Sequence, residues 1–231
     1  GEGNYKDARM ETLADKGNGN YAYIDNIMEA EKTLVKEFGG TLFTVAKDVK
    51  AQIEFNPAVV QQYRLIGYEN RMLHTEDFRD DKKDAGDMGA GHTVTLLYEL
   101  VPANTTSDEA RPVNDLKYQK YSRKKGTATD ETATIKFRYK EPQGRRSREM
   151  EHTINSTFIA FSQADENTRF AAAVALFGMV LKNSAYKGTG NYKSVAEIAA
   201  AATGTDAGGY RLEFTDLVKA AKATSERTGA R

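Results

Sequence analysis

Hydrophobic and polar residues alternate with a period of two through the middle of the chain. Val49, Ala51, Ile53 and Phe55 are separated by polar residues, a pattern typical of a strand with one buried and one solvated face. The same kind of pattern predicts further strands at 59–68, 93–101 and 132–140, with weaker candidates at 116–121 and 150–161. Because no helical pattern separates these strands, we expect them to pair antiparallel, most simply as a β-sandwich.

The period becomes helical after about residue 165. Phe170, Val174, Phe177 and Leu181 are spaced by four, three and four residues, which predicts one apolar stripe along a helix. We expect this stripe to share a core with the sheet face that carries Ile53, Phe55, Leu96, Tyr98, Ile135 and Phe137.

Two further helices are predicted toward the C-terminus. Ser194 with Glu197 matches a capping box that opens an Ala-rich helix. A last helix is predicted over 210–224, and we expect residues 225–231 to form a frayed tail.

The first 40 residues have the pattern of a short α/β unit. We predict a helix at 7–15, a strand at 21–24, and a second helix that is capped by Asp25 and ends at Gly39 and Gly40. This unit is too small to fold alone. The predicted class is therefore α+β, with a partial α/β segment at 1–40 and, at 41–231, a β-rich domain closed by helices at about 165–225.

Composition narrows the function classes. The chain has 231 residues, with 33 Lys and Arg balanced by 33 Asp and Glu, so no global field attracts nucleic acid. No apolar run approaches the roughly 18 residues of a spanning helix, and we expect any export signal to lie upstream. The absence of Cys excludes disulfides and thiolate chemistry.

The segment at 1–38, with the sequence LADKGNGNYAYID at its centre, resembles the last helix, strand and helix of a bacterial von Willebrand factor A (VWA) domain. Later segments resemble a domain of unknown function that follows the VWA domain in a group of bacterial proteins. These segments are TLFTVAKDVKAQIEFNPAVVQQYRLIGYENR, DFRDDKKDAGDMGAGHTVTLLYELVP, RFAAAVALFGMVLKNS and GYRLEFTDLVKAA. The resemblance implies a location in the cell envelope, periplasmic or surface-anchored.

VWA domains bind a divalent cation through a D-x-S-x-S loop, and this chain has no such string. The metal site of the family is therefore not carried over to any residue, and we expect no cofactor in this chain. The best local candidate for a cation is an acidic loop at 77–87 that contains Asp77, Asp80, Asp81, Asp84 and Asp87. It lacks the ligand periodicity of a calcium loop, and Arg79, Lys82 and Lys83 offset its charge, so we favour a solvated turn.

Other candidate chemistry has weak support. His74, His92 and His152 show no metal-binding spacing, and the glycine strings near the N-terminus lack the strand and helix of a phosphate loop. The basic cluster is interpreted as solvated loops; it comprises Arg123, Lys124, Lys125, Arg145, Arg146 and Arg148. Ser156 and Ser162 have no G-x-S-x-G context, which leaves nucleophilic catalysis without support.

We therefore expect a non-catalytic module that binds an unidentified protein partner or acts as a scaffold, and that docks on its own VWA domain. The alternative is a cation- or carbohydrate-binding envelope domain that uses the acidic loop. A hydrolase is the third and weakest hypothesis.

Overall fold

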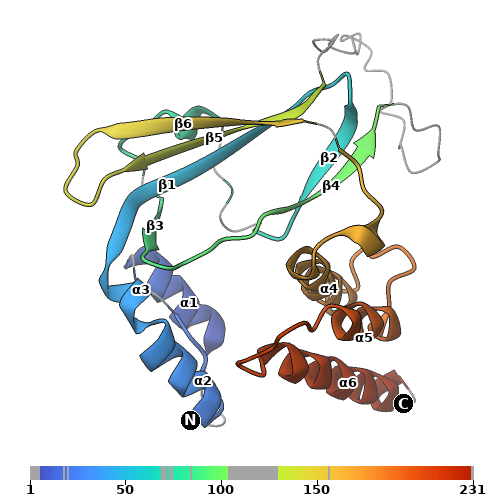
Figure 1. Ribbon diagram of the computed structural model, residues 1–231. Coiled ribbons are helices and arrows are strands. Elements are labelled where there is room, and N and C mark those ends of the chain that lie inside the picture. The colour runs from blue at the N-terminus through green and yellow to red at the C-terminus, as the bar shows by residue number, and fades with distance from the viewer. Residues whose placement is uncertain are drawn as a thin grey trace. The chain divides into compact units, whose positions relative to one another are not determined.

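The computed structural model describes residues 6–17, 19, 21–68, 72, 75–83, 85–103, 130–155 and 157–229 (Figure 1). These residues form two compact units. The first draws on Gly1–Gln62, Asn70–Val94 and Leu100–Ser156, and the second on Tyr63–Glu69, Thr95–Glu99 and Thr157–Arg231. Helices and antiparallel sheets together make the fold α+β, as predicted.

The first unit begins with short helical segments. Helix α1 spans Asp7–Lys16 and confirms the first predicted helix. The strand predicted at 21–24 is wrong, because these residues have no regular secondary structure. Helix α2 (Ile27–Glu31) is capped by Asn26 rather than Asp25, since the Asn26 side chain accepts a hydrogen bond from the Glu29 amide at 2.9 Å.

A π-helical turn, η1 (Lys32–Lys36), and helix α3 (Phe38–Leu42) continue directly from α2. The predicted helix end at Gly39 and Gly40 is wrong, because both glycines lie inside α3. Gly40 is buried where its carbonyl oxygen approaches Gly89 so closely that a Cβ atom at residue 89 would collide with it. These glycines allow a helix to contact a strand rather than to stop.

The main sheet of this unit has four antiparallel strands in the order β3-β1-β5-β6. Strand β1 (Thr44–Phe55) pairs with β5 (Glu131–Lys140), and β5 pairs with β6 (Ser147–Asn155). The predictions at 49–55 and 132–140 are confirmed. Strand β3 (Gly86–Gly89) lies where we expected a loop, and the one-turn 3-10 helix η3 spans Thr75–Phe78.

Strands β2 (Val60–Ile66) and β4 (Leu97–Pro102) form a separate two-stranded sheet. Strand β2 lies within the predicted strand 59–68, whereas β4 overlaps the predicted strand 93–101 but begins at Leu97 and ends one residue beyond it; each is shorter than expected. The candidate strand at 116–121 lies outside the described residues, and the predicted sandwich stays a prediction.

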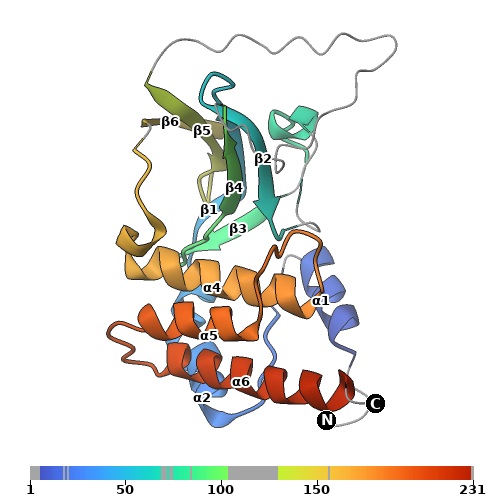
Figure 2. The same ribbon diagram turned by 90° about the vertical axis from the view of Figure 1, so that its right-hand side faces the viewer.

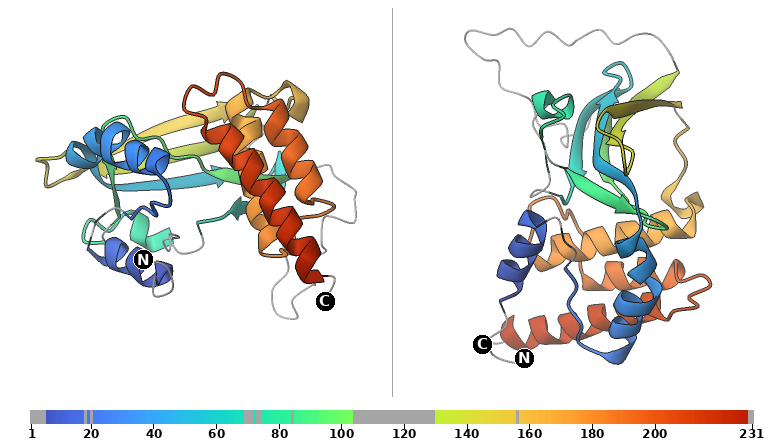
Figure 3. Two further views of the ribbon diagram at one scale, coloured as in Figure 1. Left: turned by 90° about the horizontal axis from the view of Figure 1, so that it is seen from below. Right: turned by 90° about the vertical axis from the view of Figure 1, so that its left-hand side faces the viewer.

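The described part of the second unit contains the 3-10 helix η4 (Phe161–Gln163) and three α-helices, which lie side by side in Figures 2 and 3. These are α4 (Glu166–Leu181), α5 (Tyr192–Ala201) and α6 (Tyr210–Gly229). The capping box of α5 lies three residues before the predicted one: Asn191 is the N-cap and Ser194 is the third helical residue. The frayed tail is also wrong from Ser225 to Gly229, which continue α6.

Phe177 lies at the centre of the helical core. It is 7% exposed and is clustered with Val195 of α5 and Val218 of α6. Phe170 and Phe177 both contact Phe214 edge to face, with ring centroids 5.3 and 5.4 Å apart. The stripe was expected to share one core with the sheet. Phe177 packs on α5 and α6, and Val174 and Leu181 are 43% and 54% exposed, so the stripe is not buried as a whole.

Candidate functional site

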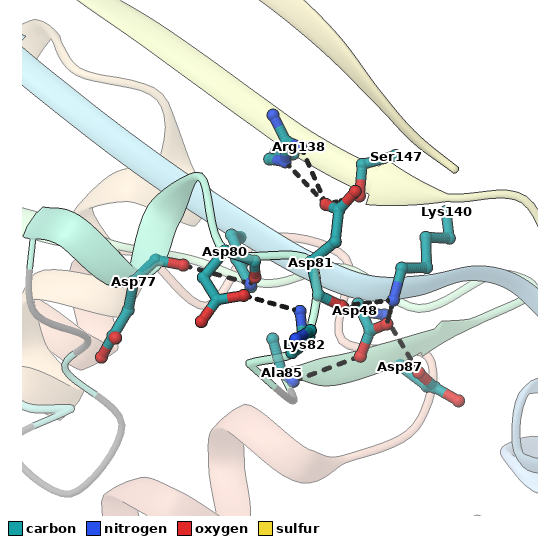
Figure 4. A network of polar contacts seen from close by, with 11 residues as sticks. Asp48, Asp77, Asp80, Asp81, Lys82, Ala85, Asp87, Arg138, Lys140 and Ser147 are labelled. Carbon is teal, nitrogen blue, oxygen red and sulfur yellow. Dashed lines mark hydrogen bonds and ion pairs between the residues drawn. The ribbon is translucent and has the colours of Figure 1, made fainter. Parts of the chain in front are cut away.

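The densest polar network lies in the first unit, between the acidic loop and a row of basic side chains on β1 and β5 (Figure 4). Lys50 of β1 is paired with Arg138 of β5, and Lys47 with Lys140, so the strand register places basic residues close together. Sequence analysis identified the loop carboxylates of this network, but neither Asp48 nor the cations that hold them.

Lys50 anchors the start of the acidic loop. Its side chain is buried in the sheet, with the residue only 4% exposed, and its ammonium donates hydrogen bonds to the carbonyl oxygens of Asp77 and Asp80 at 3.2 and 2.5 Å. A buried ammonium is costly unless hydrogen-bonded, so these carbonyls stabilise its position and it in turn fixes the loop backbone.

Asp81 connects the loop to β5 and β6. Its Oδ1 accepts hydrogen bonds from the Arg138 guanidinium at 2.8 Å and from the Ser147 hydroxyl at 2.6 Å, and its carbonyl accepts one from Lys140 at 2.9 Å. The Ser147 hydrogen bond, and then Arg138, lower the pKa of the Asp81 carboxyl.

Asp48 lies where the register of β1 shifts against both β3 and β5. Its φ of 50° is left-handed, a conformation that aspartate adopts more readily than most residues. The bulge directs its carboxylate to Lys140 at 2.5 Å and to the Ala85 amide at 3.3 Å, while its own amide donates to Asp87 Oδ1 at 3.2 Å. The end of the loop is therefore held as well as its start.

Three of the four weak metal candidates lie in the described residues, and each of them has protein partners of its own. Asp81 and Asp87 are engaged as described, and Asp80 Oδ1 accepts a hydrogen bond from the Lys82 amide at 2.9 Å. Asp84 lies outside the described residues. No cluster of three or more acidic or histidine side chains suited to a metal ion occurs in the part of the chain that the structure describes.

The lowered pKa of the Asp81 carboxyl leads to a testable prediction. Because folding lowers this pKa below its ordinary value of 3.8, ionised Asp81 stabilises the loop above that pH, and the contribution is lost as the pH falls through the lowered pKa. We expect NMR titration of the Asp81 carboxyl to show a midpoint below 3.8. The Ser147→Ala variant should move the midpoint back up, whereas Ser162→Ala, outside this network, should not. An unchanged midpoint in Ser147→Ala contradicts the assignment.

The remaining sequence candidates do not converge. His92 lies just after β3 and His152 lies on β6, while His74 lies outside the described residues. Arg145 and Arg146 are exposed in the loop between β5 and β6, and Arg148 pairs with Glu141 at 2.7 Å. The other basic candidates, at 123–125, fall outside the described ranges.

A second cluster, in the helical unit, was not predicted. The Arg64 guanidinium lies 4.1 Å from the ring centre of Tyr186, forms an ion pair with Glu99, and lies 3.9 Å from the Met179 sulfur. Within this unit it attaches the segments Tyr63–Glu69 and Thr95–Glu99 to the loop after α4. Nearby, burial and then Tyr63 raise the pKa of Tyr98. The pattern of residues within one strand does not indicate the contact of Arg64 with Tyr186.

The fold and its polar network thus define an α+β domain whose described charged groups mainly tie its own loop to its own sheet. The chain belongs to the family described as "Uncharacterized protein YfbK, C-terminal", whose model matches residues 40–224. It is 44% identical over 227 residues to "Uncharacterized protein YfbK" of Escherichia coli strain K12. That match covers 98% of this chain but only 38% of the relative.

No solved structure matches the chain. Within the described residues, no helix is both long and apolar enough to cross a membrane.

Proposed function

We propose that this chain is a non-catalytic binding or scaffolding module of a longer protein and that it docks on the domain that precedes it. The observation that carries the proposal is a series of exposed apolar side chains that runs from α2 through η1 and α3 to the residue after α3, here called the N-terminal apolar face. It comprises Ile27, Met28, Leu34, Val35, Phe38, Leu42 and Phe43.

Single exposed apolar residues are ordinary, but seven within 17 consecutive residues form a patch of the kind that marks an interaction site. Within the patch, Leu34 and Val35 lie on the π-helical turn, a local geometry frequent at functional sites. The hydroxyl of Thr33, on the same turn, is buried and has no hydrogen-bond partner among the described residues.

The occupant we propose is the preceding part of the longer protein. The family model starts at residue 40, so most of the N-terminal apolar face lies before it. The E. coli relative is much longer than the matched segment, and the family description places that segment at the C-terminal end. The resemblance of residues 1–38 to the end of a VWA domain supports a VWA domain as the docking partner, and with it an envelope location.

The alternative, a cation or carbohydrate site in the acidic loop, has less support. Asp48, Asp80, Asp81 and Asp87 already accept hydrogen bonds from the chain's own groups. A ligand cation has to displace those donors.

The docking proposal predicts a difference between the isolated chain and the full-length gene product. Val35 is 69% exposed, so Val35→Asp should change the stability of the 231-residue chain by no more than about 0.5 kcal/mol. In the full-length protein it should bury a charge in the interface and speed hydrogen exchange across 27–43 by at least tenfold. Hydrogen-exchange mass spectrometry of both forms makes the comparison.

Leu212→Asp is the matched control, because Leu212 is an exposed aliphatic residue on α6, outside the N-terminal apolar face. It should leave exchange across 27–43 unchanged. Equal exchange across 27–43 in the isolated chain and in the full-length protein contradicts the proposal.

A further inference from the structure

One of the two outer strands of the four-stranded sheet, β6, is exposed and regular. Strand β6 stands at the edge of the sheet and is paired with β5 alone among the described strands (Figure 1). Its register against β5 is unbroken from Ser147 to Ile154, and all of its residues except Ser147 are exposed. Such an edge is a template for a further strand.

The sheet register shows which backbone groups point outward. The Asn56 amide donates to the Thr132 carbonyl at 2.8 Å, in step with the pairs that join β1 to β5. Backbone groups alternate in direction along a strand, so the even-numbered residues of β5 bond to β1 and the odd-numbered ones to β6. The partners of those odd residues on β6 are even-numbered, including Met150 and His152. The backbone groups of Glu149, Glu151 and Thr153 therefore face the open edge.

On the sheet face that carries Glu149 and Glu151, the sign of the charge alternates from one strand to the next. Arg138 and Lys136 on β5 lie opposite Glu149 and Glu151 on β6, with nitrogen to oxygen distances of 3.7 and 3.5 Å. A basic strand is thus followed by an acidic one. Opposite charges on neighbouring strands are favourable, so a strand added beside β6 is best matched with Lys or Arg on this face.

The other face of the edge carries Met150 and Ile154 among the polar residues Arg148 and His152. Met150 is 54% exposed beside Phe137, and Ile154 lies beside Ala133. Aliphatic side chains of an added strand can cover both residues, which requires them to alternate with the basic ones.

A second copy of this strand is a poor occupant. The register that overlaps two antiparallel β6 strands fully places Glu151 opposite Glu151, and like charges in that position are destabilising. Acidic residues on an edge strand protect it in this way against self-association.

We infer that β6 is a docking edge for an extended segment of a separate protein, in which Lys or Arg residues alternate with aliphatic residues. This mode of recognition takes its affinity from main-chain hydrogen bonds and its specificity from alternate side chains. It concerns a different surface from the N-terminal apolar face, so either proposal can fail while the other stands.

The test uses the full 231-residue chain and a fluorescent peptide that repeats Lys-Val, measured by fluorescence anisotropy. We expect saturable binding that weakens at least tenfold when the peptide carries N-methyl groups on the backbone edge that meets β6. N-methylation removes the amide donors on that edge but leaves the charge of the peptide unchanged. Equal affinity of the N-methylated peptide shows charge attraction alone and overturns the inference, as does no binding at millimolar peptide.

Variants of the chain supply the complementary evidence. The Thr153 amide faces the open edge and makes no hydrogen bond to β5, so Thr153→Pro removes a donor to the peptide and should weaken binding at least tenfold. Thr153→Val keeps this amide and should bind the peptide normally. Glu149→Lys with Glu151→Lys should transfer preference to a Glu-Val peptide. If the charge-reversed chain still prefers the Lys-Val peptide, β6 is not the docking edge.

Discussion

Replacing Phe177 with alanine is expected to lower the free energy of unfolding of the helical unit by about 3 to 5 kcal/mol. The side chain is almost fully buried, and it contacts Phe214 and Tyr192 edge to face with ring centroids 5.4 and 6.3 Å apart. Its removal leaves a cavity at the point where α4, α5 and α6 meet. Urea unfolding followed by the far-ultraviolet signal of the helices measures the change.

Val174→Ala is the matched control on the same helix. Val174 belongs to the stripe predicted from sequence, but it is largely exposed and its truncation should cost less than about 1 kcal/mol. Equal losses for the two variants contradict the three-helix core.

The contrast between these residues shows what periodicity can and cannot predict. Spacing by three and four residues correctly predicted the helix that became α4. It did not predict which elements the apolar residues contact, because a helical stripe is equally suited to a sheet or to other helices. Here Phe177 lies against the two later helices of the chain.

The predicted boundaries of elements were wrong where one local sequence signal had two physical explanations. Gly39 and Gly40 match the signal of a helix end, yet a Cβ atom at residue 40 would collide with the His92 ring and the Ala90 carbonyl. Ser194 is part of a capping box, but as its third helical residue, because the Asn191 side chain accepts the first free amides. Strand and helix existence was more predictable than the residue at which each begins.

Part of the candidate site could be predicted from the sequence. The Asp-rich loop could be found by composition, and the alternating basic residues of β5 were present in the strand pattern. Their convergence depends on the register of β1 against β5 and on the bulge at Asp48, which are long-range features. A cluster of carboxylates therefore suggested a cation site, whereas the folded chain supplies its own cations.

Lys50→Met is expected to destabilise the first unit by about 2 to 4 kcal/mol, because charge-assisted hydrogen bonds contribute about 1.5 to 3 kcal/mol each and their loss leaves acceptors unsatisfied. Methionine keeps most of the aliphatic volume but cannot donate to the carbonyls of Asp77 and Asp80. We expect a lower urea midpoint and hydrogen exchange over 77–83 that is at least tenfold faster.

Lys136→Met provides the control, since Lys136 lies on the same sheet face but its side chain is 29% exposed and its ion pair with Glu151 is 3.5 Å long. Such a surface pair contributes about 0 to 1 kcal/mol. If the two variants lose the same stability, the buried ammonium does not anchor the loop. If only Lys50→Met speeds hydrogen exchange over 77–83, the acidic loop is held in place chiefly by Lys50 of β1. The contacts of Asp81 with Arg138 and Ser147 are then insufficient to hold it.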